Sequence, residues 1–439
     1  MVKLVCVKCG KEFSRKDRYD SHVLRVRSCT DNPRSEVAPP SSLPLDGLNF
    51  IDLFCGIGGF HCALSSLGAT CVLACDIDEN CRKVYKNNWG LEPLSDVKTI
   101  KPEDIPPFDI LCAGFPCQAF SHAGNQGGFE DTRGTLFQEI CKILKHCKPA
   151  FFLLENVKNL KGHDGGKTIA VIYKSLREVG YTMHDEPTLL SPHHLGVPQH
   201  RERLFICGVR SDLTAEPLNH FPAITVQKTD ISSILEPESV EYPELKLTKN
   251  IIELLDIWEV FIKHFKKTGV KLPTIPLWTE FWGPSDIMKK EIKQMPDWKQ
   301  EFIRKNNIFY EEHKIFLQPW LLSARNHKDF YGAKSKFEWQ CGSFKENDSL
   351  WTLLFTFRPS GIRVKRSNYS PTLVAMAQII NVGARKRKLS PREVARLQSY
   401  PDTFKMPASS AVAYKQFGNS VNVKVIERMA KFLVTEMLA

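Results

Sequence analysis

The sequence predicts an α/β protein with a Rossmann-like domain, a large inserted domain and a small N-terminal zinc finger. Between residues 48 and 210, short apolar strands that end in glycine or acidic residues alternate with amphipathic helices, as in a mostly parallel sheet covered by helices. This rhythm stops in the following region, which holds seven of the eight tryptophans. Changes in composition therefore define four segments: a zinc-finger-like module at 1–30, a linker rich in Pro and Ser at 31–47, the first part of the α/β domain at 48–210 and the insertion at 211–370.

The composition is that of an ordinary soluble globular protein of 439 residues with a net charge of +11. This excess of Lys and Arg suits a polyanionic partner such as nucleic acid. The 14 cysteines are scattered, and many lie in apolar runs, which indicates reduced thiols rather than a disulfide framework. Because the sequence has no secretory signal and no apolar run of membrane-spanning length, we expect a soluble intracellular protein without a membrane partner. Its compartment would be the cytoplasm or, in a eukaryotic host, the nucleus.

The N-terminal segment contains a C-x2-C-x12-H-x6-C pattern, which resembles a C2H2 zinc finger except that its last ligand is Cys and its final gap is long. The candidate ligands are Cys6, Cys9, His22 and Cys29. Four such ligands can close a tetrahedral Zn²⁺ site, and so short a segment needs a metal ion in order to fold. We therefore predict a structural zinc ion, the alternative being a basic N-terminus with incidental cysteines. Whether the module binds DNA or protein is open.

The first predicted strand of the α/β domain, Phe50–Phe54, runs into a turn that contains Gly56, Gly58 and Gly59. Glycine lets a backbone approach a ligand closely, and the following helix offers free N–H groups at its N-terminus. The next strand ends at Asp76, whose carboxylate can bind the hydroxyl groups of a ribose. These features leave both a dinucleotide and S-adenosylmethionine open as the cofactor.

The segment Asp109–Ser121, DILCAGFPCQAFS, is the centre of the predicted site. Its apolar run predicts a buried strand that brings Cys117 to the carboxyl edge of the sheet, where open α/β folds bind their ligands. Pro116 fixes its own φ angle and disfavours helical geometry at Phe115, so Cys117 is expected on a defined turn. Considered alone, this cysteine is expected to pack in the interior, as most free cysteines do, and the case for catalysis depends on the rest of the chain.

The order and spacing of several segments resemble the motifs of the C5-cytosine DNA methyltransferases. The segments are DLFCGIGGF (52–60), Asp76, Asp96, GFPCQAFS (114–121), GGFEDTRGTL (127–136), ENV (155–157), QHRER (199–203), LSPREVARLQSY (389–400) and YKQFGNSV (414–421). The resemblance implies a Rossmann-like methyltransferase domain that is completed by residues 371–439. It also implies S-adenosylmethionine as the methyl donor and double-stranded DNA as the substrate.

The chemistry of this family requires a nucleophile, because C5 of cytosine is not nucleophilic in the aromatic ring. A thiolate that adds to C6 makes C5 reactive, and the resemblance gives this role to Cys117. It gives Glu155 the role of neutralising the negative charge that develops on the ring near N3, and it places Arg203 at the target base. Arg201 is expected to fix Glu155, and Gln118 beside the nucleophile completes the predicted catalytic residues.

By the same resemblance, Asp76 binds the ribose of the cofactor and Asp96 its adenine amino group. Ile77 stands where the family often has a tryptophan that stacks on adenine, so an aliphatic contact is expected there. The complete predicted cofactor site is Phe54, Gly56, Ile57, Asp76, Ile77, Asp96, Pro116, Leu136, Asn419 and Ser420.

The insertion corresponds to the family's target recognition domain. It contains a basic strip, suited to phosphates or to the edges of guanine, formed by Arg358, Arg363, Lys365 and Arg366. We expect a monomer that acts on duplex DNA at a specific sequence, with a cognate restriction endonuclease as a further partner.

Two other segments extend this interpretation. The glycine-containing loop Ala119–Gly134 is expected to close over a cytosine that has been extruded from the duplex. The run Arg385–Lys388, RKRK, either faces DNA, as basic residues at this place do in the family, or serves as a nuclear localisation signal.

Two other functions fit part of the sequence. One branch of the family methylates cytosine in tRNA and shares these motifs, but it carries a compact insertion with a Cys-Phe-Thr signature that is absent here. The other is a catalytically inactive DNA-binding regulator, against which the intact Cys117, Glu155, Arg203 and Asp76 argue. The bases that are recognised do not follow from the sequence.

Overall fold

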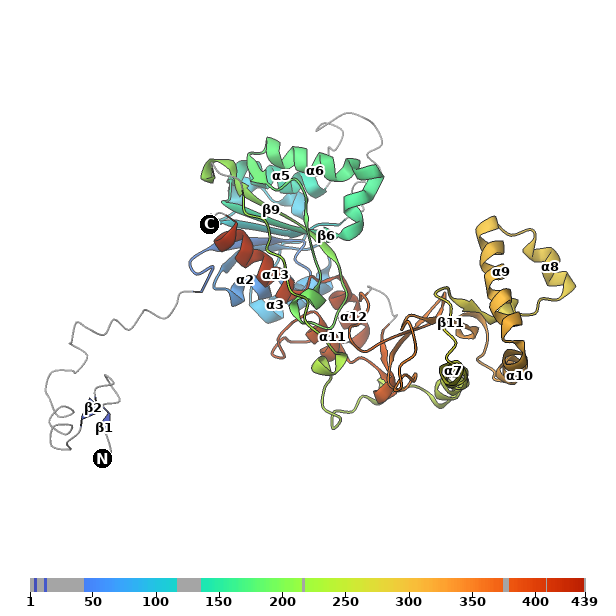
Figure 1. Cartoon of the computed structure of the whole chain (residues 1–439). Coiled ribbons are helices and arrows are strands. Elements are labelled where there is room, and N and C mark those ends of the chain that lie inside the picture. The colour runs from blue at the N-terminus through green and yellow to red at the C-terminus, as the bar shows by residue number, and fades with distance from the viewer. Residues whose placement is uncertain are drawn as a thin grey trace.

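The chain is described by a computed structural model over residues 4–5, 12–13, 43–116, 136–214, 218–373, 379–407 and 409–437. The four predicted zinc ligands, Cys117, Gln118 and the loop at 119–134 lie outside these residues. Near the N-terminus, strands β1 (Leu4–Val5) and β2 (Glu12–Phe13) pair antiparallel. From residue 43 onward the described chain forms two domains, each built around its own sheet (Figure 1).

The first domain contains the predicted parallel sheet. Its strands lie in the order β4-β3-β5-β6-β9-β7, and β8 pairs with β9. Strands β4, β3, β5 and β6 are parallel, whereas β9 runs antiparallel to its neighbours. The bounds are β3 Asn49–Leu53, β4 Thr70–Cys75, β5 Ile110–Gly114, β6 Phe151–Val157, β7 Tyr181–Met183, β8 Thr188–Leu190 and β9 Arg203–Arg210. The strands predicted after residue 48 are therefore confirmed, with small shifts at their ends.

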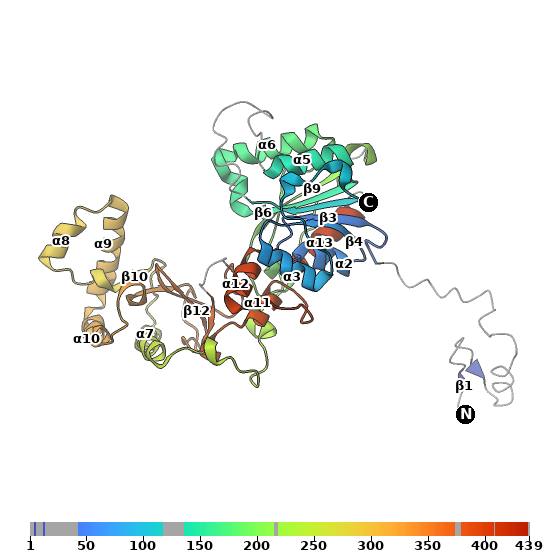
Figure 2. The same ribbon diagram turned by 180° about the vertical axis from the view of Figure 1, so that it is seen from behind.

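Helices cover both faces of this sheet. On one face, α5 (Leu136–Cys147) and α6 (Lys167–Glu178) pack on the strands, and on the other lie α2 (Gly59–Ser66), α3 (Glu79–Trp89) and α13 (Val423–Lys431) (Figures 1 and 2). The C-terminal helix α13 lies beside α2, where Ser66 Oγ donates to Glu427 Oε1 at 2.9 Å. The C-terminal part of the chain thus completes the first domain.

The second domain is formed by the insertion and by residues that follow it. Its sheet has the order β10-β11-β13-β12-β14-β15. In the core of the domain, Trp258 is fully buried and stacks on Phe337 of this sheet, with 4.6 Å between the ring centroids. The last two strands come from beyond residue 370, so the sheet extends past the predicted end of the insertion. The bounds are β10 Leu277–Trp278, β11 Lys336–Trp339, β12 Leu354–Arg358, β13 Gly361–Lys365, β14 Asn381–Val382 and β15 Arg387–Lys388.

Four helices belong to this domain: α7 Lys249–Thr268, α8 Asp286–Ile292, α9 Asp297–Glu312 and α10 Lys314–Arg325. Both views place α8 and α9 on the side remote from the first sheet (Figures 1 and 2). Helices α8 and α9 are separated at Pro296, which cannot donate a backbone hydrogen bond and serves as the N-cap of α9. Helices α11 (Pro391–Leu397) and α12 (Ser410–Asn419) follow the second sheet and lead back to α13.

The basic run at 385–388 is part of the second sheet and its surroundings. Arg387 is 5% exposed and donates from two nitrogens to the carboxylate of Glu393, at 2.8 and 2.7 Å. Lys386 Nζ lies 4.7 Å from the centroid of the Trp351 ring. Of the four residues only Arg387 is buried, whereas Lys386 and Lys388 are exposed and Arg385 is half-buried, so both predicted uses of the run stay predictions. Among the described helices, none combines the length and apolar composition needed to cross a bilayer.

Candidate active site

The candidate active site begins at the carboxyl edge of the parallel sheet. Glu155 lies within β6, in register with Gly114 of the neighbouring strand β5. A Cβ atom at Gly114 would lie 3.6 Å from Glu155 Oε2, an ordinary contact distance, so the carboxylate lies directly against β5. Since the chain runs from Gly114 through Pro116 to Cys117, Glu155 lies beside the strand that leads to the predicted nucleophile.

Glu155 is paired with one of the two predicted arginines. Arg203 Nε lies 3.1 Å from Glu155 Oε1, and the two side chains are 16% and 12% exposed. Burial raises the pKa of Glu155 above its ordinary value, and the positive charges of Arg203 and Arg201 oppose this shift. A carboxyl group in this setting holds a proton more readily than one on the surface, which suits a hydrogen-bond donor to a ring nitrogen.

Arg201, which we expected to fix Glu155, makes its direct contacts elsewhere. Its Nη1 donates to the carbonyl of Leu373 at 2.9 Å, and its Nη2 donates to the carbonyls of Gly418 and Ser420 at 3.0 and 2.9 Å. Burial lowers the pKa of Arg201 to about 9, so the guanidinium stays charged at neutral pH. Arg201 thus acts on Glu155 through its charge, while its hydrogen bonds join the chain leaving the insertion to the C-terminal segment.

Asn156 is a site residue for which the sequence analysis predicted no role. It is 3% exposed, and its Nδ2 donates to the carbonyl of Phe115 at 2.9 Å. Its Oδ1 accepts from the backbone N–H of Val157 at 2.8 Å. Asn156 therefore fixes the backbone immediately before Pro116. An amide next to a strand-borne carboxylate was the available signal, but it does not reveal which carbonyl the amide binds.

The glycine-rich turn after β3 is held by Asp76. The carboxylate of Asp76 accepts from the backbone N–H of Gly56 and of Asp78, both at 2.8 Å. Burial raises the pKa of Asp76, and these two hydrogen bonds oppose the shift. Phe54 adopts a left-handed backbone with φ of 57°, a conformation that is costly outside glycine and is found at ligand sites. The turn is therefore preorganised by the residue that is predicted to bind the ribose.

The remaining predicted cofactor residues surround this turn. A Cβ atom at Gly56 would have no neighbour within 4 Å, and Ile77 is 80% exposed, so the space beside the turn is open. From the C-terminal segment, Ser420 Oγ lies 2.7 Å from the hydroxyl of Tyr400 and 3.1 Å from a Cβ built at Gly59. The residues present thus fit a bound nucleoside, with an open backbone position at Gly56, an exposed side chain at Ile77 and the carboxylate of Asp76 at one edge.

Asp96 and the other cofactor candidates are placed by the same strands. The backbone N–H of Asp76 donates to the carbonyl of Leu94 at 3.0 Å, which brings Asp96 near the end of β4. Leu136 is the first residue of α5, and Asn419 is the last residue of α12. Ser420, which follows Asn419, lies beside Gly59, so the structure brings the turn after β3 next to the C-terminal segment.

The comparisons with known proteins agree with this arrangement. A family profile described as C-5 cytosine-specific DNA methylase matches residues 48–435. The chain belongs to this family. The methylase is 32% identical to the type II methyltransferase M.AluI of Cellulosimicrobium cellulans, with 87% of this chain and 91% of that protein covered. It is 34% identical to M.HpaII of Haemophilus parainfluenzae, with 88% and 89% covered.

Among solved structures, the methylase is similar to the Dnmt2 methyltransferase of S. pombe, with 19% identity and a TM-score of 0.45. That alignment covers 88% of this chain and 98% of the other. The family membership establishes the activity: the chain is a DNA (cytosine-5)-methyltransferase. Within the described part of the methylase, no group of three or more His, Cys, Asp or Glu side chains is arranged to hold a metal ion.

Replacing Asp76 by alanine is expected to weaken binding of S-adenosylmethionine. The change removes the predicted ribose acceptor, one hydrogen bond from Gly56 of the turn and one from the backbone of Asp78, and a charged hydrogen bond contributes about 1.5–3 kcal/mol. We expect the Kd to rise by roughly 10- to 100-fold, measured by isothermal titration calorimetry. Asp78→Ala is the matched control, since Asp78 caps α3 and its loss should lower stability by about 1 kcal/mol. An unchanged Kd for Asp76→Ala would contradict this role.

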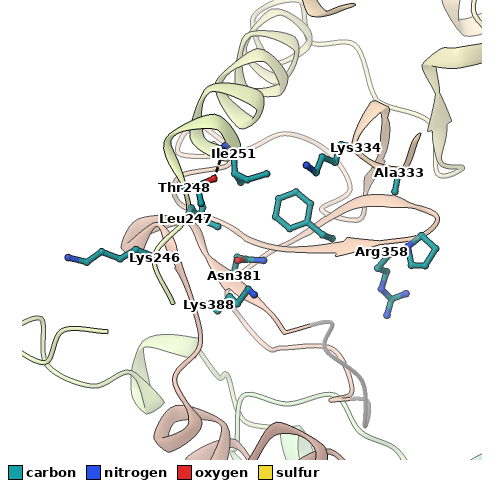
Figure 3. A pocket seen from close by; sticks show the side chains of 11 residues that line it. Lys246, Leu247, Thr248, Ile251, Ala333, Lys334, Arg358, Asn381 and Lys388 are labelled. Atoms are coloured by element: carbon teal, nitrogen blue, oxygen red, sulfur yellow. Dashed lines mark hydrogen bonds between the residues drawn. The ribbon is translucent and has the colours of Figure 1, made fainter. Parts of the chain in front are cut away.

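The second domain of the methylase presents positive charge around a cavity of about 470 Å³. The cavity lies between the N-terminal end of α7 and the strands β12, β14 and β15, and no acidic side chain lines it; its cations are Lys246, Lys334, Arg358 and Lys388. Figure 3 shows Arg358 extending away from α7, so its guanidinium belongs to the opposite side of the sheet.

One member of the predicted basic strip has a structural role instead. Arg366 donates to the carbonyls of Cys341 and Ser343, and it pairs with the buried carboxylate of Asp348. Its guanidinium is therefore used within the domain. The other three residues, Arg358, Arg363 and Lys365, remain as candidates for contact with a ligand.

Proposed function

We propose that this DNA (cytosine-5)-methyltransferase acts on a cytosine that is flipped out of duplex DNA, through a covalent bond between Cys117 and C6. The observation that carries the proposal is the Glu155–Arg203 pair beside the strand that leads to Cys117. A buried carboxyl group with a raised pKa can donate a hydrogen bond or proton to N3 while the thiolate adds. Extrusion is required because C6 cannot be reached in a stacked duplex.

The proposed steps conserve atoms and charge. The Cys117 thiolate forms a bond to C6, and the electron pair displaced from the C5–C6 double bond makes C5 nucleophilic while Glu155 stabilises the charge at N3. S-adenosylmethionine, when bound, would supply the electrophilic methyl group, and its sulfonium sulfur would keep the bonding electron pair and leave as a neutral thioether. After transfer, a base removes the proton from C5, the C5–C6 double bond re-forms and the thiolate leaves. Asp76 and the turn at Gly56 would hold the cofactor, and Arg203 would keep Glu155 in place.

The test is methyl transfer from labelled S-adenosylmethionine to unmethylated duplex DNA, with tRNA in a parallel reaction. Bisulfite sequencing of the DNA product then locates the modified cytosine. We expect label in DNA at a cytosine in one recurring short sequence. Label in tRNA alone would show that the substrate is RNA and not DNA. Absence of transfer with the cofactor bound would indicate an inactive regulator.

We also propose that the enzyme is the modification partner of a restriction endonuclease. Support comes from the relatives, because M.AluI and M.HpaII are both named type II methyltransferases. Such an enzyme protects a defined sequence, so complete modification of that sequence in DNA should block cleavage by a nuclease of the same specificity.

We further propose that residues 1–30 form a zinc finger with Cys6, Cys9, His22 and Cys29 as ligands. The spacing of these residues supports it, as does the antiparallel pairing of β1, which precedes Cys6, with β2, which follows Cys9. Metal analysis of the purified full chain should give about one zinc per molecule, and Cys6→Ser together with Cys9→Ser should remove it. A zinc content no higher than in this double variant would contradict the finger, and Cys147→Ser is the matched control.

A further inference from the structure

The second sheet has one face that is rich in charged side chains. On β11 and β13, Glu338 is directly opposite Arg363, and Arg363 is opposite Thr356 on β12. Because side chains alternate along a strand, these three share one face, while Phe337 points to the other, where it stacks on Trp258 of α7. The charged face therefore lies opposite the aromatic core of the domain.

Arg363 is held in a fixed orientation on this face. Its Nε lies 2.7 Å from Glu338 Oε2, and the other oxygen of Glu338 accepts from Gln340 Nε2. Glu338 is 6% exposed, so both of its oxygens are used and its position is fixed. Within the described chain, the side chain of Arg363 makes no hydrogen bond besides the one from its Nε to Glu338. The guanidinium thus presents a pair of donors whose direction is set by its neighbours.

Positive charge exceeds negative charge around this pair. Arg358, Arg363 and Lys365 face the single carboxylate of Glu338, and Arg358 Nε is buried without a partner in the described residues. Burial lowers the pKa of both Arg358 and Lys365, and repulsion from Arg363 adds to each shift. Cations that are partly removed from water and not neutralised by the protein favour a ligand rich in acceptors and negative charge.

The charged face is continuous with the segment QHRER (199–203), which carries Arg201 and Arg203 and is called the catalytic loop. Lys365 Nζ lies 4.7 Å from the centroid of the Tyr369 ring, and this ring lies 5.6 Å from that of His200, the neighbour of Arg201. The backbone N–H of His200 donates to the carbonyl of Ser370 at 2.8 Å. A nucleic acid bound at the catalytic loop is therefore close to the same face of β13.

We propose that Arg363, positioned by Glu338 and Gln340, reads one guanine of the recognition sequence by donating to its O6 and N7, while Arg358 and Lys365 bind nearby phosphates. The assignment depends on the proposed action on duplex DNA. A forked pair of donors matches O6 and N7 in the major groove, and such a contact contributes about 1–3 kcal/mol of discrimination. Preorganisation by Glu338 strengthens the selection, because a fixed guanidinium cannot turn toward another base.

The test uses duplexes that contain the mapped site, with each guanine in turn replaced by 7-deazaguanine, which lacks the N7 acceptor. For the natural enzyme, one position should lower kcat/KM by about 10- to 100-fold. Arg363→Met should show a similar loss on unmodified DNA and no further loss with the analogue at that position. The proposal is overturned if no guanine is sensitive, or if Arg363→Met keeps the full sensitivity.

Matched variants separate base reading from charge and from folding. Lys365→Met removes one cation from the same face and should weaken binding to all duplexes, with a salt dependence shallower by about one unit and the 7-deazaguanine effect retained. If Arg363→Met does not fold, Arg363→Lys keeps the charge without the fork and should lose the analogue effect. Glu338→Gln should reduce that effect at the same guanine. Absence of methylation in any DNA would instead refute the proposed function.

Discussion

Replacing Cys117 by serine is expected to lower the rate of methyl transfer by at least about 10⁴-fold, because the residue that forms the covalent bond is lost. A hydroxyl group at this position is almost never ionised at neutral pH, whereas a thiol is partly ionised and intrinsically more nucleophilic. The measurement is a single-turnover rate with labelled S-adenosylmethionine and a saturating duplex. The Kd for the cofactor should change little, since Asp76 and the turn at Gly56 remain intact.

The covalent step can also be observed directly. In DNA with fluorine at C5 of the target cytosine, no proton can be removed after methyl transfer, so the bond between Cys117 and C6 should persist. The natural enzyme should then form a complex with DNA that survives denaturing electrophoresis, and Cys117→Ser should form none. Cys147→Ala removes a partly buried thiol at the end of α5 and should retain the complex. Persistence of the complex in Cys117→Ser would assign the nucleophile to another residue.

Replacing Glu155 by glutamine is expected to lower the single-turnover rate by about 10²- to 10⁴-fold, the usual contribution of a positioned acid. The substitution preserves the shape of the side chain but removes its proton and its charge, and it leaves Arg203 without its ionic partner. Because buried charges without partners destabilise a fold by several kcal/mol, thermal unfolding must be measured alongside. A rate close to that of the natural enzyme, with the fold intact, would exclude Glu155 as the acid.

The pH dependence of the rate gives a second test of Glu155. If the protonated form is active, the rate falls as pH rises through the pKa of Glu155, which burial raises and Arg203 partly lowers. Arg203→Met removes this opposing charge, so the pKa should rise further and the alkaline decline should move to higher pH, at a lower maximal rate. Glu155→Gln should lack this decline. A decline at the same pH in all three proteins would belong to another group.

Much of the first domain could be predicted because its signals are local. Apolar strands of the right length end in Gly or Asp, and a glycine-rich turn must follow β3 if a backbone is to approach a ligand. The strand predicted to end at Asp76 is confirmed as β4, because its apolar run is uninterrupted. Glu155, by contrast, lies within β6.

The contacts between side chains could not be predicted in the same way. The pattern QHRER does not show which arginine reaches Glu155. Arg203 is the first residue of β9, whereas Arg201 lies before the strand and donates to the carbonyls of Leu373 and Gly418. Arg366 and Arg363 also look equivalent in the sequence, yet one is bound to Asp348 and the other to Glu338. The basic strip is thus smaller than its composition indicates.

The hydrogen bonds of Arg201 have a consequence for the newly synthesised chain. They need Gly418 and Ser420, and α13 packs on α2 through a pair separated by 361 residues. A ribosome must therefore complete nearly the whole chain before the catalytic loop and the cofactor site can close, and contacts of such long sequence separation form late in folding. The second domain, in which we propose that the target sequence is read, is already made by then. The order of synthesis thus prevents the enzyme from gaining activity before it gains specificity.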